Sequence, residues 1–190
     1  MTGFELAMAI LALLVTPGPT NTLMFLAGAE RGALRAMRLI PAELCGYLAT
    51  VLPLTLFGAA VLADRPGLRA GVALAAGIWV AWLALRLWRL PDPARVQASV
   101  DGRTVFVTTL LNPKALIFGL VLLPAPEGVW INLAHFSAQV VAVACLWALG
   151  GALIAARRAG GGSPPWVRRA AAVWLGGLSV LLVLRGIGAA

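Results

Sequence analysis

The sequence predicts an all-α membrane protein with six transmembrane helices, arranged as an inverted repeat of three plus three helices. Hydrophobic residues make up 61% of the chain and charged residues only 12%, a balance that soluble globular domains do not show. Six apolar stretches are each long enough to cross a bilayer, which takes about 20 residues. Prolines interrupt the first and the fourth stretch, so we expect helices one and four to be broken at mid-membrane.

The six apolar stretches leave no room for a soluble catalytic domain. We therefore expect a single integral membrane domain over residues 1–190 and no enzymatic activity. The first stretch carries Glu5 and has no Lys or Arg before Arg31, unlike a signal peptide, so we expect it to be retained. The predicted spans are Phe4–Ala27, Leu39–Ala63, Leu68–Leu90, Thr104–Pro124, Val129–Ala156 and Trp166–Gly188.

The two interruptions lie at corresponding positions of the two halves. Residues 16–21 read Thr-Pro-Gly-Pro-Thr-Asn, and residues 111–115 read Leu-Asn-Pro-Lys-Ala. Asn112 follows Pro17 by 95 residues, half of the 190-residue chain. Three spans per half is an odd number, so the second half enters the membrane in the opposite orientation. We predict half-repeats of about 1–92 and 100–190, joined by a polar cytoplasmic loop.

The matched interruptions predict a substrate site at the bilayer centre. Proline removes a backbone donor and breaks the helix, and such a segment must line protein or water rather than lipid. A new half-helix follows each break, and its N-terminus carries partial positive charge. Together with the ammonium group of Lys114, these ends suit a substrate carboxylate. The expected substrate-binding residues are Pro17, Gly18, Pro19, Thr20, Asn21, Asn112, Pro113 and Lys114.

An alternative interpretation of the same residues needs no substrate. The prolines can be packing kinks, with Lys114 donating to carbonyl groups that the kinks leave free. Both interpretations are open at the level of the sequence.

Three further polar residues lie within the predicted spans. Glu43 lies about one turn inside the second span, where a carboxylate can bind a substrate ammonium or carry the coupling proton; it can equally be an interfacial partner of Arg38. His135 and Gln139 lie in the fifth span and are candidates for a polar wall of the site. A packing role for His135 is the favoured alternative, and Glu5 is expected to be interfacial.

The distribution of positive charge predicts the orientation in the membrane. The net charge is +8, but the basic residues concentrate in the first, third and fifth connections, and only Arg65, Arg69 and Arg185 lie on the other side. Cytoplasmic loops carry such an excess, so we expect both termini to be external in a cytoplasmic (inner) membrane protein and expect no nucleic-acid partner. The eleven basic residues on the predicted cytoplasmic side are Arg31, Arg35, Arg38, Arg86, Arg89, Arg95, Arg103, Arg157, Arg158, Arg168 and Arg169.

These motifs resemble the LysE/RhtB family of amino-acid exporters. The resemblance rests on Pro-Gly-Pro at 17–19, a Gly-xxx-Gly run at Gly28 and Gly32, and Leu-Asn-Pro-Lys-Ala at 111–115. It covers essentially the whole chain in length and span count. It implies secondary active export of amino acids or close derivatives from the cytoplasm, by antiport with protons. The positions matching the family's motifs are Pro17, Gly18, Pro19, Asn112, Pro113 and Lys114.

The chain departs from the family pattern at two places. Residues 40–43 read Ile-Pro-Ala-Glu where further glycines are usual, and residues 123–126 read Leu-Pro-Ala-Pro without the common Pro-Gln-Phe. These departures bear on the substrate more than on the class. A small neutral amino acid is favoured, because the sequence has no acidic cluster for a second cationic group.

The sequence lacks the motifs that several other functional classes of protein require. There is no phosphate-binding G-x-x-x-x-G-K-[ST] loop for ATP, no set of metal ligands, and no sign of a cofactor. The expected partners are the substrate, protons and the lipid bilayer, and the sequence leaves a homo-oligomer open. The alternative function is a membrane-embedded thiol redox or scaffold protein that uses Cys45 and Cys145, although cysteines within spans usually behave as small buried apolar residues.

Overall fold

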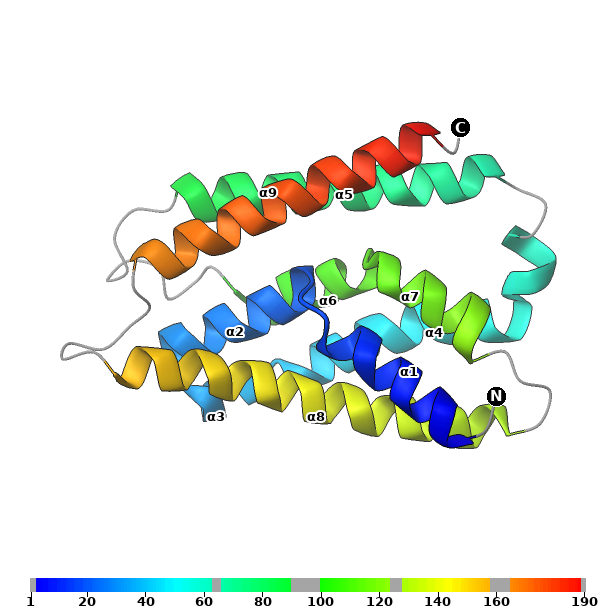
Figure 1. Ribbon diagram of the computed structural model, residues 1–190, viewed down its shortest axis with the longest axis horizontal. Coiled ribbons are helices and arrows are strands. Elements are labelled where there is room, and N and C mark those ends of the chain that lie inside the picture. Colours follow the sequence, from blue (N-terminus) through cyan, green and yellow to red (C-terminus); the bar gives the residue numbers. More distant parts are fainter. Residues whose placement is uncertain (1–2, 63–65, 90–99, 124–127, 158–164, 189–190) are drawn as a thin grey trace.

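The computed structural model describes residues 3–62, 66–89, 100–123, 128–157 and 165–188, and the regular structure in these ranges is helical. The helical regions follow the six predicted spans to within a few residues, and the fifth agrees at both ends. The all-α membrane fold class is therefore confirmed. The elements, labelled in Figure 1 where there is room, are α1 (Gly3–Val15), α2 (Pro19–Arg31), α3 (Ala33–Met37), α4 (Ile40–Leu62), α5 (Pro66–Arg89), α6 (Gly102–Leu110), α7 (Pro113–Ile117), the π-helix η2 (Phe118–Leu122), α8 (Val129–Ala156) and α9 (Pro165–Gly188).

Spans one and four are each a pair of helices bent at the predicted interruption. The bend is 61° between α1 and α2, and 46° between α6 and the helix Pro113–Leu122. In both pairs a proline, Pro19 or Pro113, begins the second helix, where its missing N–H would have no intrahelical acceptor. Each bent pair is long and apolar enough to cross a membrane as one unit, as are Ala33–Phe57 and Val129–Ala156 by themselves. The two mid-span breaks are confirmed.

The two halves of the chain interlock. Helix α2 packs mainly against α8, and α4 packs against α6 and η2. Each broken span therefore contacts the second helix of the other half, as an inverted repeat requires. The third helices of the halves, α5 and α9, pair with each other along one side of the molecule (Figure 1). The limits of the half-repeats stay a prediction, because residues 90–99 lie outside the described ranges.

Two glycines allow the backbones of α2 and α8 to touch. A Cβ added at Gly28 would overlap the carbonyl oxygen of Ala148, and one added at Gly151 would overlap the carbonyl oxygen of Phe25. The first glycine of the Gly-xxx-Gly run is thus a packing position. The second, Gly32, ends α2 with a φ of +81°, which favours glycine. The same run therefore serves two different purposes.

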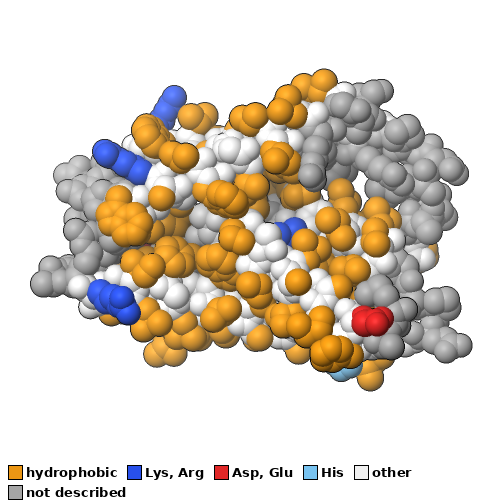
Figure 2. All heavy atoms as spheres, viewed as in Figure 1, with side chains coloured by type: hydrophobic (Ala, Val, Ile, Leu, Met, Phe, Trp, Pro, Cys, Tyr) orange, Lys and Arg blue, Asp and Glu red, His pale blue; other side chains and the backbone are white. Residues whose placement is uncertain are grey.

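The outer surface is that of a protein in lipid. Large apolar side chains are exposed over most of its length, and basic side chains gather at one end of the face in Figure 2. The tryptophans near helix ends, Trp88, Trp130 and Trp166, are exposed. Helix α1 begins and helix α9 ends at the opposite end of the molecule in Figure 1. Which end faces the cytoplasm stays a prediction.

The arginines at the basic end differ in one respect from the sequence interpretation. Several that we placed in loops lie in terminal turns of helices, among them Arg31, Arg86 and Arg89. A cation near a helix C-terminus also interacts favourably with the helix dipole, which explains why the helices continue through these residues. Arg65, Arg95 and Arg158, which we placed in loops, lie outside the described ranges.

Candidate functional site

The first break is held by side chains that bond the carbonyl groups it frees. The amide nitrogen of Asn21 donates to the carbonyl oxygens of Leu14 at 2.7 Å and Thr16 at 3.0 Å. The hydroxyl of Thr22 donates to the carbonyl oxygen of Gly18 at 2.8 Å. The last carbonyls of a helix have no intrahelical donor, so Asn21 satisfies the end of α1 from within the first turn of α2.

The second break is held by Asn112, which also joins it to the first. Its side-chain oxygen accepts from the backbone N–H of Lys114 at 3.1 Å and so caps α7. Its amide nitrogen donates to the hydroxyl of Thr20 at 3.2 Å and to that of Tyr47 at 3.3 Å. The hydroxyls of Thr20 and Thr109 lie 3.2 Å apart. One buried polar cluster therefore connects both breaks and α4.

Lys114 reaches from the second break to the first. Its ammonium group donates to the carbonyl oxygen of Thr16, and its side chain is half-buried. Gly18 leaves space for it, because a Cβ there would lie 3.2 Å from both Cε and Nζ of Lys114. The carbonyl contact is the one that the packing interpretation expects. An ammonium has three donors, so this bond leaves donors that can engage a ligand.

Glu43 is buried inside the bundle, in the first turn of α4. The residue is 2% exposed, and its Oε2 has no hydrogen-bond partner in the described part of the chain. Arg38, its suggested interfacial partner, is exposed, and no ion pair joins the two among the described residues. The carboxylate interacts electrostatically with Lys114 instead. A buried charge without full hydrogen bonding is costly, which marks Glu43 as a functional candidate.

Tyr47 belongs to the cluster, although sequence reasoning missed it. Its side chain is 1% exposed, and its ring packs edge-on against Phe118 and Phe136. Two signals were available: it is the one tyrosine of the sequence, and it follows Glu43 by four residues, a spacing that puts both on one face of a helix. Buried tyrosine hydroxyls usually find a partner, here Asn112.

His135 and Gln139 do not contribute to this cluster. They line a separate cavity of about 460 Å³ between α1 and α8, together with Asn132 and apolar residues that include Leu6 and Ile10. His135 is exposed, so the interpretation as a packing histidine is wrong. The side chain is directed outward because its helical neighbours Leu133 and Phe136 occupy the buried face of α8. Gln139 Oε1 is buried and has no partner among the described residues.

The two cysteines show no sign of redox pairing. Both are free, and Cys45 is exposed, so the expectation that it would be a buried residue is wrong. The helical period explains the exposure of Cys45. Glu43 and Tyr47 are buried, and Cys45 lies between them in the sequence and therefore on the opposite face of α4. Among the described residues, no three His, Cys, Asp or Glu side chains could together hold a metal ion.

A comparison with protein-family models completes this description. The LysE type translocator model matches residues 11–186. The chain belongs to this family. The match includes both breaks, Glu43 and the whole polar cluster. The family is one of membrane exporters rather than enzymes, and the chain is a multi-pass membrane protein. No curated protein and no solved structure matches the chain.

Proposed function

We propose that this LysE type translocator is a secondary active exporter of amino acids or close derivatives across the cytoplasmic membrane. The substrate carboxylate is held where the two broken helices meet, by Lys114 and the N-terminus of α2. The driving force is proton antiport. The observation that carries the proposal is the contact across the two breaks, in which Lys114 of one half bonds the carbonyl of Thr16 in the other.

This contact supports a carboxylate site for an electrostatic reason. The ammonium group of Lys114 lies within the apolar bundle, where a charge is costly and is usually retained for function. The N-cap of α2, Gly18, provides no side-chain cap, so the cap residue supplies no acceptor for the free N–H groups at the positive end of that helix. A carboxylate can replace the Thr16 carbonyl as the acceptor for Lys114, because it adds the attraction of opposite charges to a hydrogen bond whose donor is already charged.

Glu43 can have either of two roles in the proposed transport. As a buried carboxylate one turn from Tyr47, it can hold the substrate ammonium or carry the coupling proton. Its electrostatic interaction with Lys114 couples the two charges, because a change at either group alters the energy of the other. Protonation of Glu43 would therefore change how strongly Lys114 holds its acceptor, which is what an antiporter requires.

Counterflow in proteoliposomes tests the proposal. Purified protein is reconstituted with a panel of unlabelled neutral amino acids inside the vesicles, and uptake of the same labelled amino acid is followed. Two leucine analogues that lack the carboxylate, leucinamide and isoamylamine, are included as competitors. We expect counterflow with at least one amino acid and no competition by either analogue. If uptake is no greater than in protein-free vesicles for every amino acid of the panel, the transport proposal is overturned. If the analogues compete as strongly as leucine itself, the carboxylate site is overturned.

A further inference from the structure

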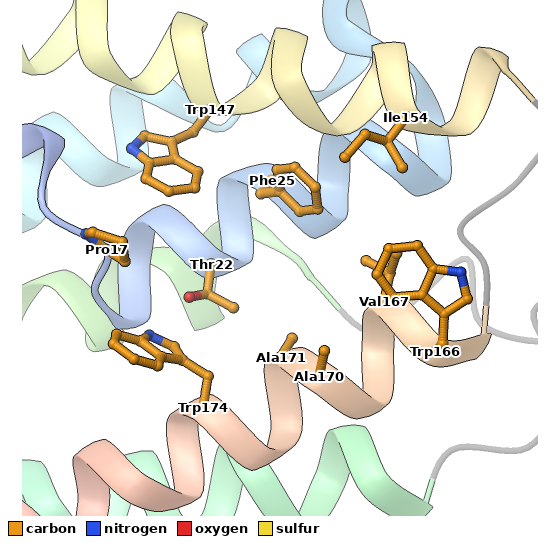
Figure 3. Close-up of a pocket in the computed structure, with 10 residues that line it drawn as sticks. All are labelled: Pro17, Thr22, Phe25, Trp147, Ile154, Trp166, Val167, Ala170, Ala171 and Trp174. Atoms are coloured by element: carbon orange, nitrogen blue, oxygen red, sulfur yellow. The ribbon is translucent and has the colours of Figure 1, made fainter.

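An apolar groove opens beside the first break. It has a volume of about 320 Å³ and lies between α2, α8 and α9. The lining is almost entirely apolar and contains Phe25 and three tryptophans, Trp147, Trp166 and Trp174. In Figure 3, Pro17, Trp147 and Trp174 lie at one end of the groove, and Ile154 and Trp166 lie at the other. The groove thus extends from the break along α9 toward the N-terminus of that helix.

The inner end of the groove adjoins the proposed carboxylate site. Pro17 lines the groove, and both of its chain neighbours contact Lys114: the carbonyl of Thr16 accepts from its ammonium, and Gly18 packs beside it. The groove and the ammonium group therefore flank the same three-residue segment, so that one molecule can reach both. The groove offers such a molecule an apolar surface.

The chemistry of the lining selects for an apolar group. The one hydroxyl among its lining residues, that of Thr22, already donates to Gly18. No charged side chain is among those residues. Trp147 Nε1 is a buried donor without a partner in the described part of the chain, and such a donor is costly unless something accepts from it. Small-molecule sites are typically built this way, with an apolar wall and a few polar groups that set the orientation.

The order of polarity along the groove argues against a lipid chain as the occupant. A lipid has its charged group at the membrane surface and its apolar end at the bilayer centre. Here the charged group, Lys114, lies at the central end, beside Pro17, and the far end is the exposed Trp166 at the start of α9. An amino acid held by its carboxylate at the centre has the matching order.

We propose that the groove holds the side chain of the exported amino acid, so that the protein exports neutral amino acids with branched or aromatic side chains rather than the small ones that the sequence favours. The inference rests on the proposed function and narrows its substrate class. A volume of about 320 Å³ is at the lower end of the range for small-molecule sites, which is about 300–1,000 Å³. It is ample for the side chain of leucine or phenylalanine and leaves that of alanine with few contacts.

The test compares L-leucine, L-phenylalanine and L-alanine as competitors in the counterflow assay. In the unmodified protein we expect the first two to compete at least about tenfold more strongly than alanine, because a single methylene in an apolar pocket already gives about 10- to 200-fold discrimination. Ala171 lines the groove, so Ala171→Phe should weaken leucine about tenfold and leave alanine nearly unchanged. Val173→Phe introduces the same side chain on α9 at an exposed position outside the lining and should change neither.

The outcomes separate this inference from the proposed function. If no amino acid is exchanged, the proposed function fails. If amino acids are exchanged but leucine and alanine compete equally, or Ala171→Phe affects neither, the groove is no side-chain site and only the inference is overturned. Retained alanine exchange shows that the Ala171→Phe variant is folded. If the Ala171→Phe variant loses alanine exchange, Ala170→Phe is tested in its place, because Ala170 is a more exposed lining position. The same results for leucine and alanine are then expected.

Discussion

Glu43 is the carboxylate on which coupling is expected to depend. If it exchanges the driving proton, Glu43→Gln should abolish export driven by a pH gradient and preserve substrate exchange, because the amide resembles the protonated acid. If it holds the substrate ammonium, both activities should fall about tenfold or more, since a hydrogen bond to a charged group contributes about 1.5–3 kcal/mol. Both activities are measured on the same vesicle preparation. Unchanged rates in both would remove Glu43 from the site.

The residues of the site were only partly predictable from the sequence. Asn112 and Lys114 were found because their proline motif has a counterpart in the other half. Tyr47 was missed because its hydroxyl acquires a role only when α4 packs against the second break. His135 and Cys45 were misjudged for a related reason. Within an apolar span, the sequence alone does not distinguish the face that meets protein from the face that meets lipid.

The close packing of α2 against α8 depends on a glycine, Gly28. Gly28→Ala should lower the apparent free energy of unfolding by about 1–3 kcal/mol, the usual cost of overpacking, because the added Cβ meets the carbonyl of Ala148. Gly71→Ala is the control, since nothing lies within 4 Å of its added Cβ and alanine is the better helix former. Thermal unfolding in detergent compares the two. Equal melting temperatures would contradict the close approach of α2 and α8.

Helix α6 begins at a cap that is expected to respond to pH. The carboxylate of Asp101, just outside the span, accepts from the backbone N–H of Thr104 at 2.7 Å. Hydrogen bonds with the side chain and then with the backbone of Thr104 lower the pKa of Asp101. Asp101→Ala should cost about 1 kcal/mol, a typical value for an N-cap, while Asp101→Asn should preserve the cap at neutral pH.

The sign of the pH effect follows from the lowered pKa. The cap of the unmodified protein contributes stability above the unfolded aspartate pKa of about 3.9 and loses it as the pH falls through the lower folded value. The cap of the Asn variant does not titrate. Melting temperatures measured from pH 7 to pH 3 should therefore fall faster for the unmodified protein than for Asp101→Asn. Parallel curves would contradict a carboxylate cap.

The helices were more predictable than the contacts between them. Hydrophobic length located all six spans, and the prolines located both breaks. The π-helix η2 was not predicted, because its wide turn lies where Gly119 meets α4: a Cβ there would be 2.6 Å from Cβ of Leu54. The pairing of α5 with α9 was not predicted either. It depends on contacts between distant segments, such as the hydroxyl of Ser179 donating to the carbonyl of Gly77 at 2.9 Å.

The predicted orientation of the whole molecule in the membrane rests on its charge. Most of the Lys and Arg side chains coloured in Figure 2 gather at one end, and in Figure 1 helix α1 begins and helix α9 ends at the other. Reporter fusions after Arg95 and after Arg158 should therefore report a cytoplasmic location, and a fusion at Ala190 an external one, as the positive-inside rule requires. A cytoplasmic reporter at Ala190 would reverse the orientation and with it the side from which each half-helix is reached.

The proposed transport site depends on one charge, that of Lys114, at the meeting point of the two breaks. Counterflow of the neutral amino acid that the protein exchanges fastest should be compared for the unmodified protein, Lys114→Met and Ile117→Met. The last is a matched control on the same helix, at an exposed apolar position. We expect Lys114→Met to lose exchange by about tenfold or more, in keeping with a lost charge-assisted hydrogen bond, while Ile117→Met matches the unmodified protein. Full exchange by a folded Lys114→Met variant would show that the lysine only packs against the kinked helices and would contradict the proposed site.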